Sequence, residues 1–203
     1  MESNIKVDAE ILKFLIGICF GKYNDKYKAA ANRAYLDMNR TLRFDKKTDL
    51  DRDKLRNDVV SLLKNEIIAF MKNKAFCRQE DFDSWHFNIC GEIKSIYQKE
   101  DISFTYGQAQ KWINMTFKYL YILRNEEVLK ILKYLHVPLD RYIINAAYKE
   151  FGIAYPNIVW SKWDDYEGQY LAYQKELRTH ISFEEPLRWE IKQWNKEVLP
   201  LLK

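Results

Sequence analysis

The stretch TYGQAQKWINMTFKYLYIL, residues 105–123, decides how this chain is interpreted. Its apolar and aromatic side chains recur at helical spacing, and Lys111 stands close to its start. This pattern predicts a helix whose surface is largely apolar. A lysine in that place is either an ordinary surface charge or a buried amine kept for chemistry. The first reading suits a helical binding protein, and the second suits an enzyme.

The remaining sequence also follows a helical period. It has four prolines, six glycines and no long alternation of apolar and polar residues. Outside residues 105–123, helices are expected over residues 8–20, 25–44, 48–73, 81–98, 126–135, 138–152, 161–179 and 184–197. The sequence therefore predicts a compact all-α bundle of about eight to ten helices. We expect one domain spanning residues 1–203, and a second lobe stays open because no linker marks a boundary.

Composition indicates a soluble globular protein with a mild preference for anions. Of its 203 residues 47% are hydrophobic and 31% charged, and the net charge is +4. Residues 22–47 contain eight Lys or Arg against three acids. This stretch is either a phosphate-facing surface or a solvated helix face. In the first case Arg33, Arg40 and Arg43 are candidate phosphate contacts, because salt-dependent binding to nucleic acid needs such charges.

The cysteines and the apolar runs bear on location. Three cysteines without a CxxC pair fit a reducing, cytoplasmic setting. The longest apolar run, FLIGICF at residues 14–20, is far short of a membrane span and has no basic segment before it. We therefore expect neither a signal peptide nor a membrane anchor.

The segment GQAQKWIN, residues 107–114, contains residues that suit an anion site and a nucleophile. Gly107 and Gln108 fall at the expected helix start, where free backbone N–H groups attract phosphate. Lys111 follows one turn later. The positive end of the helix dipole and the neighbouring Trp112 and Ile113 disfavour its charged ammonium form. A partly deprotonated lysine is what an amine nucleophile requires.

The segment HVPLDRYI, residues 136–143, has the complementary group. Pro138 is expected to open a helix, which places Asp140 in the first turn, where the helix dipole favours the carboxylate. A carboxylate held charged can stabilise a developing positive charge. Together with an uncharged Lys111 it suits attack on an electron-poor carbon such as an anomeric centre.

These two segments together resemble the helix-hairpin-helix DNA glycosylases. That family has a hairpin of the type L-P-G-V-G-[RK]-K-T-A-N followed by a segment of the type h-P-V-D-T-H-V. Gly107 matches the first hairpin glycine, Lys111 the Schiff-base lysine of the bifunctional members, and Asp140 the essential aspartate. The resemblance covers about residues 104–152. The 28 residues between Lys111 and Asp140 make it most similar to the archaeal 8-oxoguanine glycosylase branch.

The resemblance implies base excision from duplex DNA in which a damaged base is flipped into a pocket. It implies that Lys111 attacks C1′ of the sugar while Asp140 stabilises the positive sugar and helps to activate the amine. Trp112 and His136 are candidate pocket residues. No cofactor or metal is expected, and the cysteine spacing excludes the iron–sulfur cluster of some members. The hairpin departs from the family at Ala109, which replaces a glycine, and at Trp112, which replaces a threonine.

Several alternatives stay open beside the glycosylase. The main one is a non-catalytic helical protein that binds nucleic acid or protein, for example in phage–host conflict. It would use the basic helix or an aromatic stripe at helical spacing, formed by Trp163, Tyr166, Tyr170 and Tyr173, which otherwise belongs to the core. A further set of rings could face a pocket: Trp112, Tyr119, Trp160, Trp189 and Trp194. A zinc site is a further alternative, and its candidate ligands are Cys77, His86, Cys90 and His136.

Overall fold

The computed structural model describes residues 8–44, 50–73 and 78–199, and the regular structure of these residues is helical throughout. The α-helices are α1 (Ala9–Phe20), α2 (Lys26–Met38), α3 (Arg52–Lys72), α4 (Gln79–Gln98), α5 (Tyr106–Ile122), α6 (Glu126–Ile131), α7 (Arg141–Phe151), α8 (Ala172–His180) and α9 (Pro186–Val198). Short 3₁₀ helices are η1 (Asn39–Thr41), η2 (Leu132–Tyr134) and η3 (Trp160–Lys162), and η4 (Tyr166–Leu171) is a π-helix. Nine α-helices in the described ranges confirm the expected all-α class.

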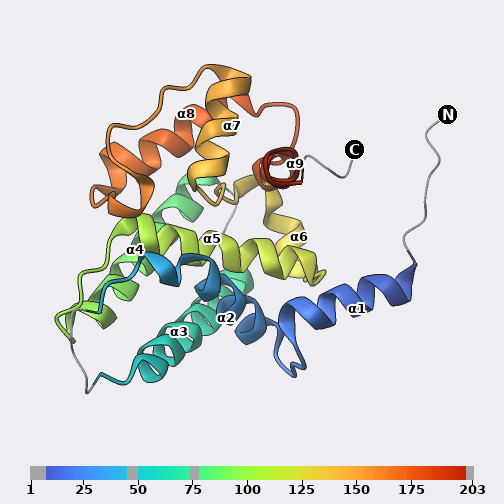
Figure 1. Ribbon diagram of the computed structural model, residues 1–203, viewed down its shortest axis with the longest axis vertical. Helices are drawn as coiled ribbons and strands as arrows, with labels where there is room; N and C mark the ends of the chain where they lie inside the picture. Colours follow the sequence, from blue (N-terminus) through green and yellow to red (C-terminus); the bar gives the residue numbers. More distant parts are fainter. Residues whose placement is uncertain (1–7, 45–49, 74–77, 200–203) are drawn as a thin grey trace.

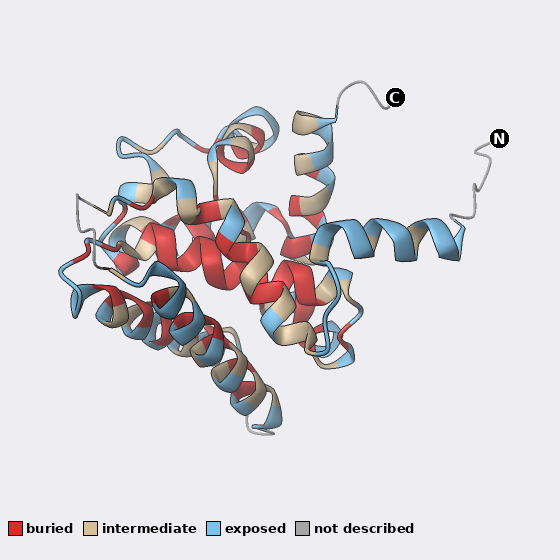
Figure 2. Ribbon diagram, turned by 60° about the horizontal axis from the view of Figure 1, so that its bottom comes forward, coloured by how far each residue is buried: buried red, intermediate tan, exposed pale blue. Residues whose placement is uncertain are grey.

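Helix α5 is the central element of the fold. In the view of Figure 1 it crosses the middle of the molecule, with α2 and α3 below it and α7 and α8 above. Every residue from 107 to 120 is buried, so this helix is enclosed on all sides (Figure 2). Its polar side chains are enclosed together with its apolar ones, so each of them needs a partner inside the protein. The two lysines of α5, Lys111 and Lys118, are buried with it.

The closest neighbour of α5 is α2. Three of the buried residues of α2 are small, since Ala30, Ala31 and Ala34 are all fully buried. Small side chains let two helix backbones approach, and the indole of Trp112 uses that proximity to donate from Nε1 to the carbonyl of Ala31 at 2.8 Å. Trp112 is therefore a core residue, which fixes α2 against α5.

Gly107 is required for the contact between α5 and η3. A Cβ atom at Gly107 would lie 1.8 Å from the carbonyl oxygen of Trp160, which is backbone and cannot turn aside. The N–H of Gly107 also donates to the carbonyl of Trp163 at 2.9 Å. The start of α5 is thus pressed against the η3 segment.

We expect Gly107→Ala to destabilise the protein by about 3 kcal/mol, at the upper end for overpacking, because two backbones must separate. Urea denaturation measures the change. The matched control is Gly91→Ala in α4, where an added Cβ meets nothing within 4 Å. That variant should be stabilised by about 0.5–1 kcal/mol, since alanine is the better helix former. Equal stability of the two variants would contradict the proposed packing.

Two helix starts differ from the sequence expectation. Pro138 does not open α7: Asp140 is the N-cap and the helix begins at Arg141. Ser161 does not cap the next long helix either. It lies in η3, and helical structure resumes at Tyr166 after the cap Asp165, whose Oδ1 accepts from the N–H of Gly168 at 2.9 Å. The physical reason is the contact with α5, because the carbonyl of Trp163 is occupied by an N–H from outside its own segment.

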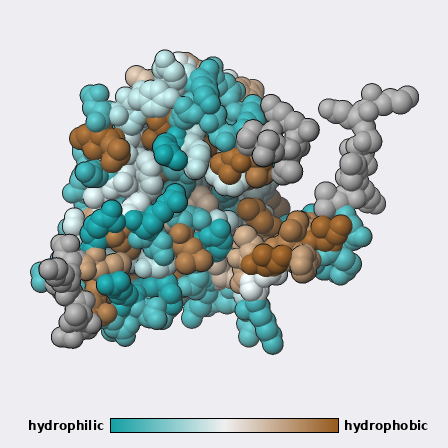
Figure 3. Space-filling model, viewed as in Figure 1, coloured by the Kyte–Doolittle hydropathy of each residue, from teal (hydrophilic) through white to brown (hydrophobic). Residues whose placement is uncertain are grey.

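Helix α1 projects from the rest of the molecule. Figure 1 shows it extending away from the other helices, and none of its residues is buried. Its apolar side chains Ile11, Phe14, Leu15 and Ile18 are each more than half exposed, and they form the brown surface of the projecting arm in Figure 3. Over the described residues, no helix combines the length and the apolar character needed to cross a membrane.

Candidate active site

Lys111 and Asp140 meet in the folded chain. The Nζ atom of Lys111 lies 2.8 Å from Oδ2 of Asp140, and the side chains are 5% and 16% exposed. Lys111 comes from the second turn of α5 and Asp140 from the N-cap of α7. The two groups chosen from the sequence are therefore brought together, as an ion pair.

The Asp140 carboxylate is fixed by its role as a helix cap. Its Oδ1 atom accepts hydrogen bonds from the N–H groups of Tyr142 at 2.9 Å and Ile143 at 3.0 Å, which are otherwise unsatisfied at a helix start. Burial by itself would raise the pKa of Asp140. The Lys111 ammonium and the two backbone donors outweigh burial and hold the pKa below its ordinary value. One oxygen thus anchors the side chain while the other faces Lys111.

Two glutamines hold the extended segment that leads to Asp140. Gln110 accepts from the N–H of Leu139 at 3.3 Å and donates to its carbonyl at 3.1 Å. Gln174 does the same at Val137, accepting at 3.1 Å and donating at 2.7 Å. Each side-chain amide thereby replaces the neighbouring strand that an extended backbone normally pairs with. The position of Asp140 follows from this pair of contacts.

We expect Gln110→Leu to lower both the stability of the protein and the activity of the candidate site, because it leaves the buried N–H and carbonyl of Leu139 without partners. Each such group costs about 1–3 kcal/mol. The matched control is Gln174→Leu, which removes the same two contacts at Val137, three residues from Asp140, and leaves the Val137 carbonyl a longer bond of 3.4 Å from Asn114. Urea denaturation should show comparable losses of stability in the two variants. Gln110→Leu should nevertheless lower the activity of the candidate site more. Equal activity of the two variants would contradict the positioning role of Gln110.

Lys111 and Asp140 line a cavity of about 520 Å³. One face of each of three helices forms its walls. These faces consist of residues 33, 36, 37 and 40 in α2 and η1; residues 111, 115, 118, 119 and 122 in α5; and residues 190, 191, 194, 195 and 198 in α9. Four aromatic side chains contribute to the lining: Tyr119, Tyr142, Trp160 and Trp194. A volume of this order accommodates a small organic molecule such as a nucleobase with its sugar.

A second buried ion pair lies in the same cavity. Lys118 stands two turns beyond Lys111 on α5, and its Nζ is 2.9 Å from Oε1 and 2.8 Å from Oε2 of Glu190 on α9. Glu190 is fully buried, and its desolvation raises the pKa above the ordinary value although Lys118 and Lys111 both lower it. The cavity thus contains two amines and two carboxylates in contact.

The arginines expected at a phosphate surface divide into two groups. Arg33 and Arg40 line the cavity, and Nη1 of Arg33 lies 2.8 Å from Oδ1 of Asp37. The other oxygen of Asp37 accepts from the hydroxyl of Tyr119 at 2.5 Å. Arg43 is exposed and outside the cavity lining, and its guanidinium donates to the carbonyls of Arg40 and Leu42.

Four residues chosen from the sequence lie elsewhere. The backbone N–H of Gly107 donates a hydrogen bond to the carbonyl of Trp163, and the backbone N–H of Gln108 donates to the hydroxyl of Thr105. Neither N–H is therefore a free donor for phosphate. Trp112 is enclosed in the core. The fourth residue, His136, is buried away from the cavity lining. These four residues are therefore left out of the candidate site.

His136 belongs to a buried hydrogen-bond chain on the other side of α5. Its Nε2 is 2.8 Å from Oδ1 of Asp83, and its Nδ1 is 2.8 Å from the hydroxyl of Tyr170. Asn114 donates to the same hydroxyl at 2.8 Å and contacts Nε2 of His86 at 3.1 Å through its side-chain oxygen. This chain satisfies polar groups inside the core.

The rival sites suggested by the sequence fall within the core as well. The aromatic stripe of Trp163, Tyr166, Tyr170 and Tyr173 is buried, so its rings do not form a stacking surface. Of the zinc candidates, Cys77 lies outside the described residues. Among the residues that are described, no three His, Cys, Asp or Glu side chains are grouped so as to hold a metal ion.

Sequence reasoning missed Lys118, Glu190 and Asp37. Lys118 could have been found from its spacing, because a residue seven positions after Lys111 lies on the same helix face. Glu190 and Asp37 are brought in by tertiary packing alone. Comparisons with protein-family models, with curated proteins and with solved structures found no match to this chain.

Proposed function

We propose that this chain is a DNA base-excision enzyme in which Lys111 is the nucleophile and Asp140 its electrostatic partner. The observation that carries the proposal is the 2.8 Å contact between Lys111 Nζ and Asp140 Oδ2 on the wall of a cavity lined by aromatic rings. The resemblance of residues 104–152 to helix-hairpin-helix DNA glycosylases supports the same two roles.

The proposed reaction begins from the ion pair. As the bond between C1′ and the base lengthens, positive charge develops on the sugar, and the Asp140 carboxylate beside it stabilises that charge. The base departs with the electron pair of its bond to C1′. The Lys111 ammonium gives a proton to the Asp140 carboxylate along their contact, and the lone pair freed on Nζ then forms the bond to C1′. Opening of the sugar ring, with a proton gained by the ring oxygen, then gives a Schiff base.

The cavity supplies what such a reaction needs from its surroundings. Its rings can stack on a base that has been flipped out of the duplex. Arg40 adds positive charge to its lining, which suits a phosphate beside that nucleotide, whereas the charge of Arg33 is balanced by Asp37. The Lys118–Glu190 pair keeps a second amine close by but engaged with its own carboxylate.

Borohydride trapping tests the proposal directly, because it reduces a Schiff base to a stable covalent adduct. The protein is incubated with duplexes that contain 8-oxoguanine, uracil, hypoxanthine, an alkylated purine or an abasic site. We expect an adduct with at least one of these, and its loss in Lys111→Ala. Lys118→Arg, which changes the other buried lysine of the cavity, is the matched control and should retain the adduct. Absence of any adduct across the panel contradicts the proposal.

A non-catalytic binding protein is the second candidate, and the exposed apolar surface of α1 favours it. Helices this apolar are usually covered. This candidate predicts DNA or protein binding with no trapped adduct on any lesion and no effect of Lys111→Ala on binding. The same trapping experiment therefore separates the two candidates.

A further inference from the structure

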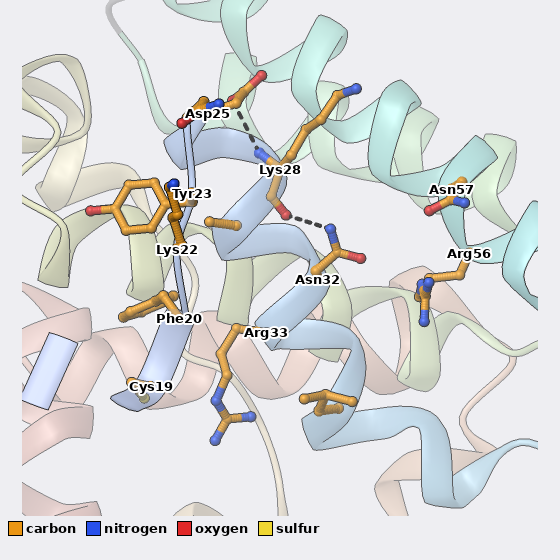
Figure 4. Close-up of a pocket in the computed structure, with 13 residues that line it drawn as sticks. Cys19, Phe20, Lys22, Tyr23, Asp25, Lys28, Asn32, Arg33, Arg56 and Asn57 are labelled. Atoms are coloured by element: carbon orange, nitrogen blue, oxygen red, sulfur yellow. Dashed lines mark hydrogen bonds between the residues drawn. The ribbon is translucent and has the colours of Figure 1, made fainter. Parts of the chain in front are cut away.

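A second cavity adjoins the candidate active site. It has a volume of about 570 Å³ and lies between the end of α1, the 21–25 turn, α2 and α3 (Figure 4). Cys19, Arg33 and Leu36 line both cavities, so the two lie next to each other along α2. A ligand that extends out of the candidate active site past Arg33 would therefore enter the second cavity.

The second cavity is basic. Lys22, Lys28, Arg33 and Arg56 line it, against the single acid Asp25. That carboxylate is already engaged, because Oδ2 of Asp25 lies 2.7 Å from Nζ of Lys64 and Oδ1 caps the start of α2.

The two lysines at the opening of this cavity are its most available cations. Lys22 and Lys28 are both exposed, and within the described ranges neither side chain has a carboxylate partner. The two arginines of the lining are paired instead, Arg56 with Asp53 at 3.2 Å and Arg33 with Asp37 at 2.8 Å, so the unpaired charge is that of the two lysines. Unpaired positive groups around a hollow attract an anionic ligand.

The positive charges are spread along the axis of α2 rather than gathered at one place. Along α2 and its η1 extension, Lys28 precedes Arg33 by five residues and Arg33 precedes Arg40 by seven. Arg33 and Arg40 share a helix face, and Lys28 lies about 140° around the helix from Arg33. At 1.5 Å per residue these steps correspond to about 8 Å and 10 Å along the helix. Successive phosphates of one strand of a duplex are about 3.4 Å apart along the axis, so the charges match phosphates two to three nucleotides apart.

Uncharged groups between the cations fit a nucleic acid better than an acidic protein. The ring of Tyr23 is 39% exposed and stands edge-on to Phe20, with ring centres 6.4 Å apart. An exposed ring beside phosphate-binding cations can stack on a base or sugar. The amides of Asn24, Asn32 and Asn57 in the same lining offer both donors and acceptors to base edges.

We infer that the exposed face of α2 and the second cavity bind the sugar–phosphate backbone that flanks the nucleotide held in the candidate active site. Lys22 and Lys28 contact phosphates, and Tyr23 packs on a sugar or base. The inference rests on the proposed function, which places the reacting nucleotide in the candidate active site and so gives the direction in which the strand leaves it. To that site it adds a second one, for several nucleotides on one side of the reacting nucleotide.

The salt dependence of DNA binding tests this site without any chemistry. Fluorescence anisotropy of an undamaged labelled duplex gives Kd between 50 and 200 mM salt. Because each phosphate contact contributes about 0.9 to the slope of log K against log salt, Lys22→Ala/Lys28→Ala should reduce the slope by about 2. The matched control is Lys162→Ala/Lys175→Ala, which removes the same charge from two exposed lysines within residues 158–190, where four Lys or Arg stand against seven acids. Its slope should equal that of the wild type.

Three results would overturn the inference: an unchanged slope in Lys22→Ala/Lys28→Ala, an equal decrease in the control, or an effect on binding to phosphatidylserine vesicles with none on DNA. Borohydride trapping separates this site from the proposed function. A reduced slope without any adduct leaves the strand site standing while the catalytic proposal fails. An adduct at Lys111 with an unchanged slope leaves catalysis standing and removes the strand site.

Discussion

Replacing Asp140 by asparagine should reduce the trapped adduct by about 100-fold or more and destabilise the fold by about 3 kcal/mol. Asparagine caps a helix as well as aspartate does, so the variant removes the charge and leaves the cap. General-base and electrostatic contributions of one side chain are of the order of 100-fold or more. The loss of stability arises because the buried Lys111 ammonium, 5% exposed, would lack its counter-charge.

Two further variants make this prediction specific. Asp165→Asn changes an N-cap aspartate that is exposed, so it should leave both stability and adduct formation close to those of the wild type. Lys111→Met/Asp140→Asn removes both charges and should recover most of the stability lost by Asp140→Asn, because the penalty belongs to the unpaired charge. The double variant should form no adduct. Asp140→Asn with wild-type stability would show that Lys111 is not held as an ion pair.

Acidification should destabilise the protein steeply between pH 6.5 and pH 5. His86 and His136 are both buried, and burial lowers the pKa of His86 well below 6.5. Burial also lowers the pKa of His136, although the hydrogen bond to Asp83 opposes the shift. The unfolded chain therefore binds more protons than the folded one below pH 6.5, so the stability present above that pH is lost as the pH falls. Two protons correspond to a slope of up to about 2.7 kcal/mol per pH unit.

Urea denaturation at several pH values between 5 and 8 measures this slope. His86→Gln removes one of the two protons and should reduce the slope by about half. His180→Gln, at the exposed end of α8, is the matched control and should leave the slope unchanged. A free energy of unfolding that stays constant between pH 6.5 and pH 5 would contradict the buried, neutral state of both rings.

Most of the helices could be predicted from the sequence because their caps and apolar stripes are local signals. Asp8 and Gly152 mark an N-terminal and a C-terminal helix end as expected, and Gly152 has the left-handed φ of 73°. Ser161 was misread because a better partner for its segment comes from α5, far away in the chain. Such a contact leaves no periodic trace in the sequence.

The site could be predicted in part, for a similar reason. Lys111 and Asp140 carry local signals, since Lys111 follows a helix start and Asp140 caps one, and they meet in the structure. Whether a helix start is open to an anion depends on what packs against it, and at Gly107 the backbone of Trp160 occupies that space. Glu190 gave no local signal, since a glutamate on an amphipathic helix is usually exposed.

The contrast between α5 and α1 has a consequence for motion. Amide hydrogens of α5 should exchange with solvent only when the whole molecule unfolds, because every residue from 107 to 120 is buried. Those of α1, which has no buried residue, should exchange far sooner through separate local openings. Cys19, at the end of α1, lines the candidate active site, so Lys111 lies on the helix expected to open last while one wall beside it opens in separate local fluctuations.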